Sequence, residues 1–396
     1  MRLVLYTGKG GVGKTTTAAA TAVCAAARGV PTLVVSADAA HSLGDVLAHP
    51  LAGEAERREP QPVADRLHAL EVDARRAMER HWGRVRDYLI SLFRYQGIEA
   101  VVAEELALLP GAEELATLLA VQELAESGRY ELVVVDCAPT DSTLRLVTLP
   151  DVADGALRWL LRLQQALSAV VTPLARSLVP VPLPGPEVFR DADRLLYRRL
   201  RGLRALLSAR ETSVRLVVTP ERMVIDEARR AHTDLSLFGV ACDAVVMNRL
   251  LPEAACAEPF FRDWGVLQEE RLREVEEAFA PLPVLRAPLQ EDEVVGTERL
   301  ARHGHELFGR REPGAVLGRA PRLRFTRAGT GYQLTLSLPG ASAAELDVTK
   351  VEGELLLSTG RTRRAIVLPR RVAALDLAGA KLERGRLLVR FAGGAP

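Results

Sequence analysis

The chain has 396 residues, more than one ordinary domain holds, and 48% of them are hydrophobic, which is enough for a sizeable core. The formal net charge of +1 gives no overall positive field for nucleic acid, and no run of about 18 apolar residues predicts a transmembrane helix. Because the four cysteines are scattered and the first residues enter a strand directly, we expect a soluble, cytoplasmic protein without a signal peptide or disulfide frame.

Residues 8–16 form a phosphate-loop sequence that fits G-x-x-x-x-G-K-[ST]. Residues 3–6 before it predict a buried strand, and residues 16–28 after it are Ala-rich and predict a helix. The loop's glycines let backbone N–H groups point at phosphate oxygens, Lys14 supplies a cation for the β- and γ-phosphates, and the Thr15 hydroxyl takes one Mg²⁺ position. We therefore expect the chain to bind and hydrolyse a nucleotide. The candidate nucleotide-binding residues here are Gly8, Lys9, Gly10, Gly11, Val12, Gly13, Lys14, Thr15 and Thr16.

Two acidic residues are expected to join this loop. Residues 31–36 predict a second strand, and Asp38 follows its carboxyl end, where ligands of open α/β sheets collect. A carboxylate there can orient or deprotonate the attacking water, although an aspartate capping the next helix has the same position. Residues 131–136 predict an apolar strand that ends in Asp136, which is expected to hold Mg²⁺. Thr15, Asp38 and Asp136 are thus the candidate surroundings of the metal.

The remaining pattern of residues 1–311 alternates strands with helices. Residues 49–66 predict a polar loop, 67–72 a third strand, and 73–127 helices. Residues 214–219 and 244–247 predict further strands with a helix at 221–234 between them. This alternation indicates a doubly wound, mostly parallel sheet of the α/β class.

Residues 151–212 interrupt that pattern with a helical insertion. Its first part places apolar residues at helical spacing, a proline-rich stretch follows, and a second amphipathic run surrounds leucines with arginines. Such helices either cover the core with a solvated basic face or bind a ligand on their apolar side, and a basic surface also suits anionic lipid. The apolar positions are Leu160, Leu163, Leu167, Val170, Val171, Leu174, Leu178, Leu196, Leu200, Leu203 and Leu207.

The C-terminal residues have a different period. Helical patterning ends near Arg311, residues 312–321 predict a linker, and residues 322–396 alternate in short strands with Gly and Pro turns between them. Short, evenly spaced strands indicate a small all-β sandwich.

Several motifs resemble one ATPase family. The second lysine of the loop, Lys9, and the runs at 38–43 (D-x-A-H-S-L), 109–114 (L-P-G-x-E-E), 136–145 (D-x-A-P-T-x-x-T-L-R) and 288–296 (P-L-x-x-x-E-V-x-G) are similar to the ArsA and tail-anchored-protein targeting ATPases. In the first switch Ala39 stands where the family usually has proline, and in the second Cys137 stands where it usually has threonine.

This resemblance implies a homodimer in which Lys9 reaches the partner's nucleotide and joins Lys14 and Asp38 in catalysis. It implies a first switch with His41 and Ser42, a second switch with Pro139 and Thr140, and base contacts from Asn248, Pro288 and Leu289. It also implies that the helical subdomain at 151–212 takes hydrophobic, transmembrane-type protein segments as clients, with a membrane receptor as a further candidate partner. No nucleic-acid partner is expected.

The C-terminal strands resemble the α-crystallin domain of small heat-shock proteins. Leu338-Pro339-Gly340 matches the L-P-G turn of that family, and residues 380–387 match its A-x-x-x-x-G-x-L hairpin. The resemblance implies an α-crystallin-like domain fused to the ATPase, while a generic sandwich for protein contacts is the alternative.

Cysteine usage separates the rival functions. Residues 253–259 contain Cys256 alone, where relatives that bind zinc across the dimer carry C-x-x-C, so ATP or ADP and Mg²⁺ are expected and no structural zinc is predicted. An ATPase that drives an arsenite pump is the first alternative, which the absence of a cysteine cluster disfavours. A partition-type ATPase that binds DNA or a membrane through the arginines of 190–210 is the second.

Overall fold

The computed structural model describes residues 1–37, 42–51, 59–72, 112–137, 140, 199–318, 323–360, 362–383 and 385–393, with isolated positions between 83 and 99. The chain divides into two compact units: one holds residues 1–71, 130–144 and 210–396, and the other holds 72–129 and 145–209. The second unit thus takes in more of the chain than the helical insertion expected at 151–212. Asp38, His41, Pro139 and most of that insertion lie outside the described residues.

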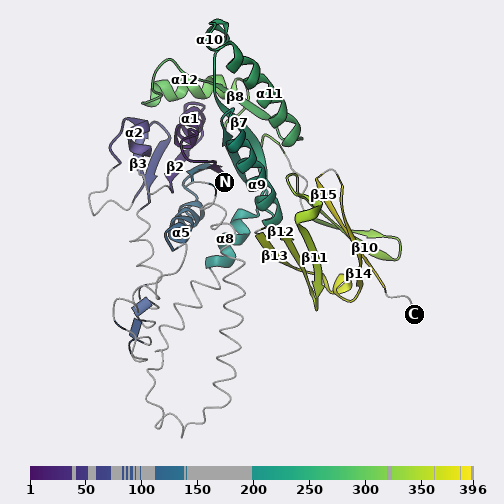
Figure 1. Ribbon diagram of the computed structural model, residues 1–396. Coiled ribbons are helices and arrows are strands. Elements are labelled where there is room, and N and C mark those ends of the chain that lie inside the picture. Colours follow the sequence, from purple (N-terminus) through teal and green to yellow (C-terminus); the bar gives the residue numbers. More distant parts are fainter. Residues whose placement is uncertain are drawn as a thin grey trace. The chain divides into compact units, whose positions relative to one another are not determined.

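A mostly parallel eight-stranded sheet is the centre of the first unit (Figure 1). Its strand order is β3-β4-β2-β5-β1-β6-β7-β8, and every neighbouring pair is parallel except β3 and β4. The inner strands are continuous apolar runs, as expected of strands covered on both faces. The doubly wound α/β class predicted from the sequence is confirmed. The strands are β1 (Arg2–Thr7), β2 (Thr32–Ser36), β3 (Gln61–Ala64), β4 (Leu67–Glu71), β5 (Leu132–Asp136), β6 (Thr212–Val218), β7 (Cys242–Leu250) and β8 (Val284–Pro288).

Strand β3 lies where the sequence predicts only loop. It pairs antiparallel with β4 at the edge of the sheet and contains Pro62. A proline is tolerated at an edge because its missing N–H is not needed by a second neighbour. The side chains of this strand are only partly buried, so the strand needs few apolar residues, and its sequence shows almost no strand pattern.

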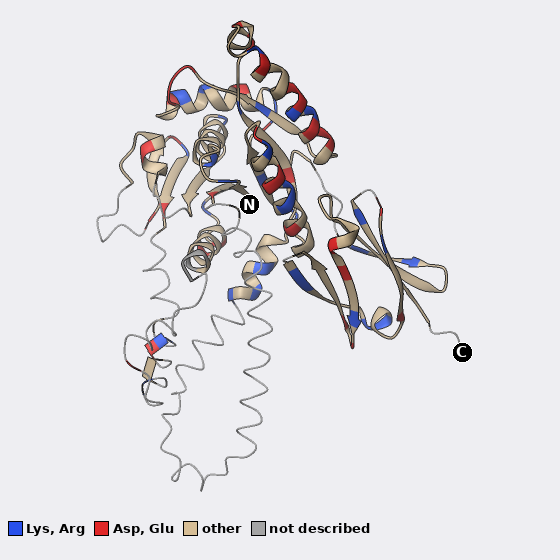
Figure 2. Ribbon diagram, in the orientation of Figure 1, with Lys and Arg blue, Asp and Glu red and all other residues tan. Residues whose placement is uncertain are grey.

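Helices cover both faces of this sheet. On one face α1 (Lys14–Ala27) packs against α12 (Thr297–Phe308), and on the other α9 (Arg222–Phe238) packs against β6, β7 and α11 (Arg262–Ala278). The alanines of α1 are buried and allow close approach to the sheet. Figure 2 shows charges of both signs along α11, whereas Lys14 is the only charged residue of α1. Two short helices complete the list, α2 (Leu43–Leu47) and α10 (Glu253–Ala257).

The C-terminal strands form the predicted sandwich. One sheet has the order β14-β15-β10-β9 and the other β11-β12-β13, with all neighbours antiparallel. Alternate side chains point into a shared core that includes Leu336, Leu357 and Val389. The strands are β9 (Arg324–Ala328), β10 (Gly331–Ser337), β11 (Leu346–Val351), β12 (Glu354–Thr359), β13 (Thr362–Val367), β14 (Asp376–Glu383) and β15 (Arg386–Ala392), with a short α13 (Arg370–Ala373).

The sandwich packs directly on α9. Leu237 of this helix is part of the sandwich core, and the backbone N–H of Gly340 donates to Thr233 Oγ1 at 2.9 Å. Arg364 of β13 donates to the Leu237 carbonyl and lies over the Phe238 ring. The L-P-G turn noted in the sequence is therefore part of a contact with the ATPase sheet's own helix.

The second unit contributes two described helices, α5 (Ala112–Glu126) and α8 (Leu200–Leu207), which contact each other. Leu200, Leu203 and Leu207 of α8 are buried, and Arg199 forms an ion pair with Glu123 at 3.1 Å. For these residues the expected separation of leucines from arginines is confirmed. Among the described residues, no helix is both long and apolar enough to cross a membrane.

His232 of α9 gives the fold a dependence on pH. Its ring stacks on Phe279, and neither ring nitrogen has a hydrogen-bond partner among the described residues. Burial lowers the pKa of His232 to about 4. Since an unfolded histidine titrates near 6.5, the free energy of unfolding should fall by about 1.4 kcal/mol per pH unit as the pH drops from about 6.5 to about 4.

Urea unfolding at several pH values tests this expectation. His232→Leu, which keeps the apolar contact with Phe279, should flatten the loss of stability between pH 6.5 and pH 4.5. His305→Gln, at an exposed position of α12, is the control and should leave the slope as in the wild type. Equal slopes for wild type and His232→Leu would contradict the assignment.

Candidate nucleotide site

The phosphate loop joins β1 to α1 in the predicted strand, loop and helix context. Gly8 follows β1 and lies so close to β6 that a Cβ atom there would be 2.3 Å from the Val217 carbonyl oxygen. Gly13, with a φ of 90°, turns the chain into α1. Any larger residue at Gly8 would push the loop off the sheet. The path of the loop therefore depends on the absence of side chains at Gly8 and Gly13.

The side chain of Lys14 folds back onto the phosphate loop. It is the first residue of α1, its side chain is buried, and its Nζ donates to the Lys9 carbonyl oxygen at 3.2 Å. The amine therefore lies among the backbone N–H groups of the loop, next to the positive end of the helix, where a phosphate would lie. Lys9 itself is half-buried, and Gly10 and Gly11 are exposed.

The three parts that could surround Mg²⁺ come from neighbouring elements. Thr15 Oγ1 lies 3.4 Å from Ser42 Oγ, which places the start of α1 beside the first switch. Asp136 is completely buried at the end of β5, in register with Tyr6 of β1. The Ala37 N–H donates to the Asp136 carbonyl oxygen at 2.8 Å, so the chain still runs beside the end of β5 at the residue before Asp38.

Hydroxyl and carboxylate oxygens are the ligands that Mg²⁺ prefers, so Thr15 and Asp136 fit this ion. The ion would supply charge neutralisation for the phosphate oxygens of the nucleotide. Of the three residues predicted to surround the ion, Thr15 and Asp136 are described and Asp38 is not. Their assignment as ligands stays a prediction.

Asn248 lies against the phosphate loop. Its side chain is buried at the carboxyl end of β7, and its Nδ2 donates to the Val12 carbonyl oxygen at 2.8 Å. Pro288 ends β8, and the Leu289 N–H donates to the Leu250 carbonyl oxygen at 2.7 Å. These residues thus lie at the carboxyl ends of adjacent strands, and the expected contact with adenine stays a prediction.

Thr17 is a residue of this site that the sequence analysis missed. Its hydroxyl donates to the Gly13 carbonyl oxygen at 2.7 Å, in parallel with its backbone N–H, so it fixes the last peptide of the loop. The available signal was a run of threonines at the start of an otherwise alanine-rich helix. Thr140 of the second switch is buried, and Asp38, His41 and Pro139 lie outside the described residues.

The four cysteines lie on four different parts of the first unit. Cys24, Cys137 and Cys242 are buried, and the half-buried Cys256 packs beside Gly265 and donates to the Leu251 carbonyl oxygen. Burial raises the pKa of both Cys24 and Cys242. Within the described ranges, no three His, Cys, Asp or Glu side chains come together in a group that could hold a metal ion.

Two family models match the chain. The anion-transporting ATPase model matches residues 1–309, and the model of an HSP20-like domain found in ArsA matches residues 329–391. The chain belongs to the ArsA ATPase family. It is therefore an ATPase that uses nucleotide with Mg²⁺, and its β-sandwich is of the HSP20-like type found with this ATPase.

Relatives span almost the whole chain. A protein of Aquifex aeolicus named putative arsenical pump-driving ATPase 1 is 34% identical, over 98% of this chain and 99% of its own. A putative arsenical pump-driving ATPase of Chlorobaculum tepidum is 35% identical, over 95% and 92%. ATPase GET3B of Arabidopsis thaliana is 29% identical over 74% of this chain and 75% of its own.

Removing the buried amine of the loop tests the nucleotide site. Lys14→Ala should weaken MgATP binding by about 10- to 100-fold, because hydrogen bonds to charged groups contribute about 1.5–3 kcal/mol. Equilibrium binding of a fluorescent ATP analogue with Mg²⁺ measures this. Lys381→Ala removes an exposed lysine of the β-sandwich and should bind as wild type does. Unchanged affinity in Lys14→Ala would refute the assignment.

Proposed function

We propose that this ATPase is a homodimeric molecular switch that binds hydrophobic, transmembrane-type protein segments and chaperones or targets them. The observation that carries the proposal is where the second unit is inserted in the chain. We call this unit, residues 72–129 and 145–209, the helical unit after its described helices α5 and α8. That unit begins directly after β4, returns to the sheet at β5, and begins again after residue 144, eight residues beyond Asp136. Both excursions therefore start at the carboxyl edge where the nucleotide site lies.

This connectivity links the chemistry to the helices. The second unit begins again at residue 145, nine residues after Asp136, so a change at Asp136 or at the second switch would have a short path along the backbone into residues 145–209. Loops that contact a γ-phosphate commonly order in one nucleotide state and relax in the other. The helical unit is thus the part of the chain best connected to sense hydrolysis, which supports a client site there.

The proposed roles are those expected from the sequence. Lys14, Thr15, Thr16 and Asp136 bind the Mg-nucleotide, and Asp38 positions the attacking water. Asn248, Pro288 and Leu289 contact the base, and Gly8, Gly10, Gly11, Val12 and Gly13 present backbone N–H groups to the phosphates. His41 and Ser42 act in the first switch, and Pro139 and Thr140 in the second.

Dimerisation would let Lys9 act on the partner's nucleotide. Lys9 is half-buried at the open end of the loop, and a cation inserted from a second subunit can neutralise transition-state charge as an arginine finger does. Phe260, Trp264 and Val266 are exposed where α11 begins, shortly after the carboxyl end of β7. A second copy placed on this edge would cover them, which supports the same interface.

An arsenite-pump-driving ATPase is the second candidate, because two relatives that cover nearly the whole chain carry that name. Stable arsenite sites gather two or three thiols around one arsenic atom, whereas the four cysteines lie on separate parts of the first unit: Cys24 on α1, Cys137 after β5, Cys242 on β7 and Cys256 on α10. We therefore place the client-binding function first.

A trapped nucleotide state tests the client site. Asp38→Asn should retain MgATP and lose turnover, because the amide cannot accept the proton of the attacking water. In that state a peptide spanning one transmembrane segment should bind at least tenfold more tightly than a charge-matched soluble peptide, and ADP should remove the difference. Fluorescence anisotropy with labelled peptides measures both.

Two results would contradict this reading. Equal binding of the two peptides would mean that the helices only cover the hydrophobic core, and it would favour the arsenite function. Stimulation of turnover by arsenite would then support that function. Normal turnover in Asp38→Asn would refute the role of Asp38.

Mixing two inactive variants tests Lys9. Lys9→Ala should bind nucleotide without turnover, and Lys14→Ala should bind it so weakly that its own site stays mostly empty at an ATP concentration that fills the wild-type site. A mixed dimer pairs an intact nucleotide site on the first subunit with an intact Lys9 on the second, so mixing should restore part of the ATPase activity. Activity of the mixture that equals the sum of the separate variants, or full activity of Lys9→Ala alone, would contradict action across a dimer.

A further inference from the structure

A row of polar side chains crosses the centre of the sheet beneath α1. Tyr6 of β1 is in register with Asp136 of β5 on one side and with Arg215 of β6 on the other. Side chains in register on parallel strands point to the same face, so all three point toward α1. The nucleotide site and the Arg215 guanidinium are therefore separated by the Tyr6 side chain alone along this row.

Tyr6 connects that row to the phosphate loop. Its hydroxyl lies 2.6 Å from Thr21 Oγ1, and Thr21 Oγ1 donates to the Thr17 carbonyl oxygen at 2.7 Å. Because Thr21 has one hydroxyl hydrogen and uses it on Thr17, the Tyr6 hydroxyl is the donor to Thr21. Thr17 in turn donates to the Gly13 carbonyl oxygen, which is the last of the loop.

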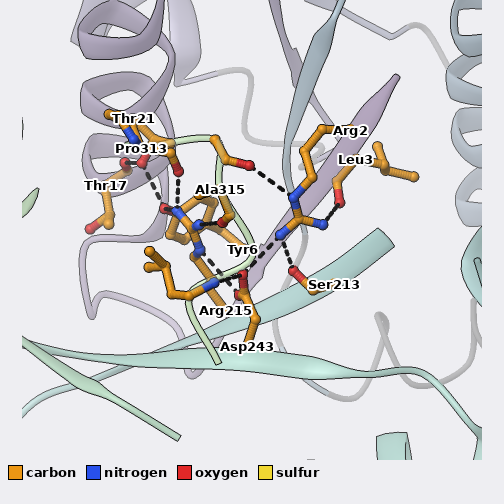
Figure 3. A network of polar contacts seen from close by, with 12 residues as sticks. Arg2, Leu3, Tyr6, Thr17, Thr21, Ser213, Arg215, Asp243, Pro313 and Ala315 are labelled. Carbon is orange, nitrogen blue, oxygen red and sulfur yellow. Dashed lines mark hydrogen bonds and ion pairs between the residues drawn. The ribbon is translucent and has the colours of Figure 1, made fainter. Parts of the chain in front are cut away.

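On its other side Tyr6 accepts a hydrogen bond from Arg215. Arg215 Nη1 donates to the Tyr6 hydroxyl at 3.0 Å, and its Nε donates to Asp243 Oδ1 at 3.2 Å (Figure 3). Every hydroxyl from Arg215 to Gly13 thus points its hydrogen toward the loop. Hydrogen bonds aligned in one direction from a cation strengthen one another inside a protein.

The Arg215 end of this series of hydrogen bonds contacts the segment that the sequence predicts as a linker. We call residues 313–317 the strap. Arg215 donates to the Pro313 and Ala315 carbonyl oxygens at 2.8 and 2.9 Å, Arg2 donates to the Gly314 carbonyl oxygen at 2.9 Å, and the Leu317 N–H donates to Asp243 Oδ2 at 3.1 Å. The strap is therefore a docked element that leads from α12 toward the sandwich.

The docked strap satisfies a buried cation. Arg215 is completely buried. Burial disfavours its charge, but the neighbouring Tyr6 and Asp243 outweigh that effect and raise the pKa of Arg215. Release of the strap would remove two carbonyl acceptors of Arg215 together, and a buried cation left short of partners is costly. We therefore expect the strap to dock or to be released as a whole.

We propose that Tyr6 and Arg215 are positioning residues that couple the phosphate loop to the strap, so that nucleotide binding and strap docking stabilise each other. A bound phosphate orders the loop and with it the Gly13 peptide, Thr17 and Thr21. The Tyr6 hydroxyl is then held in the position that Arg215 needs when it also binds the strap. Through the strap, the nucleotide state reaches the chain that enters the HSP20-like domain. This coupling rests on nucleotide binding alone and not on the client proposed above.

Hydrogen exchange on the full chain tests the coupling. With Mg²⁺ and a non-hydrolysable ATP analogue at saturation, wild-type strap amides, the Leu317 N–H above all, should exchange at least about fivefold more slowly than without nucleotide. Tyr6→Phe keeps the ring and removes only the hydroxyl that joins Arg215 to Thr21, so it should bind the analogue and lose this protection. Tyr332→Phe, in the β-sandwich, should keep it.

The reciprocal effect gives a second, independent readout. A Cβ at Gly318 would be 2.6 Å from Pro283 Cδ and 2.9 Å from the Asp243 carbonyl oxygen, so Gly318→Ala should displace the strap without touching the nucleotide site. We expect it to weaken binding of the analogue by about fivefold or more. Gly353→Ala has open space around its Cβ and is the matched control, with wild-type affinity.

The outcomes separate coupling from a merely structural role. A structural role predicts a lower melting temperature for Tyr6→Phe with nucleotide-dependent protection of the strap unchanged, and that result would overturn the proposal. The proposal would also be overturned if the strap amides of the wild type exchanged at the same rate with and without nucleotide. Unchanged nucleotide affinity in Gly318→Ala would overturn it too. Loss of protection in Tyr6→Phe together with weakened binding in Gly318→Ala would support it.

Discussion

The contacts at the centre of the sheet depend on one guanidinium, that of Arg215, which is fully buried. Arg215 has to find partners for its N–H groups inside the sheet, and removing one partner of a buried charge costs about 3–5 kcal/mol. It finds them on Asp243 of β7, on Tyr6 of β1 and on the strap that follows α12. One side chain thus joins two neighbouring strands to a segment almost one hundred residues away, and Arg2 joins the same carboxylate from the other side.

Two groups of residues with separate tasks lie side by side on this sheet. The carboxyl ends of β1, β5, β7 and β8 carry the residues of the candidate nucleotide site: the phosphate loop, Asp136, Asn248 and Pro288. The Arg215 cluster instead fixes the position of the strands and of the chain that leaves the ATPase domain. Tyr6 belongs to both, because it is in register with Asp136 on one side and with Arg215 on the other. A change at the nucleotide therefore has a short path to the strap.

Much of this could be predicted from the sequence because it depends on local signals. The phosphate loop requires glycines at fixed spacing, so Gly8 and Gly13 were recognisable without any structure, and the close approach to Val217 explains one of them. The period-two pattern of the C-terminal strands likewise predicted the sandwich. The family models that match residues 1–309 and 329–391 confirm both parts.

The rest depends on contacts between distant residues. In the sequence Arg215 is an ordinary polar interruption of a strand, and the proline and glycine of the strap predict a linker. Neither local pattern reveals that Arg215 binds the strap, because the two are almost one hundred residues apart. Strand β3 was missed for a related reason: an edge strand with half-covered side chains needs little hydrophobicity. The role of Thr17 depends on a carbonyl oxygen one turn earlier, which composition alone does not reveal.

The proposed function requires that the nucleotide state controls a site for hydrophobic segments within residues 145–209. Photo-crosslinking can locate that site, with an apolar peptide that carries one photoreactive residue, mixed with Asp38→Asn in MgATP or in MgADP and mapped by mass spectrometry. We expect crosslinks within residues 145–209 that form with ATP and fade with ADP. Crosslinks of equal strength in both nucleotides, or crosslinks confined to the β-sandwich, would contradict it.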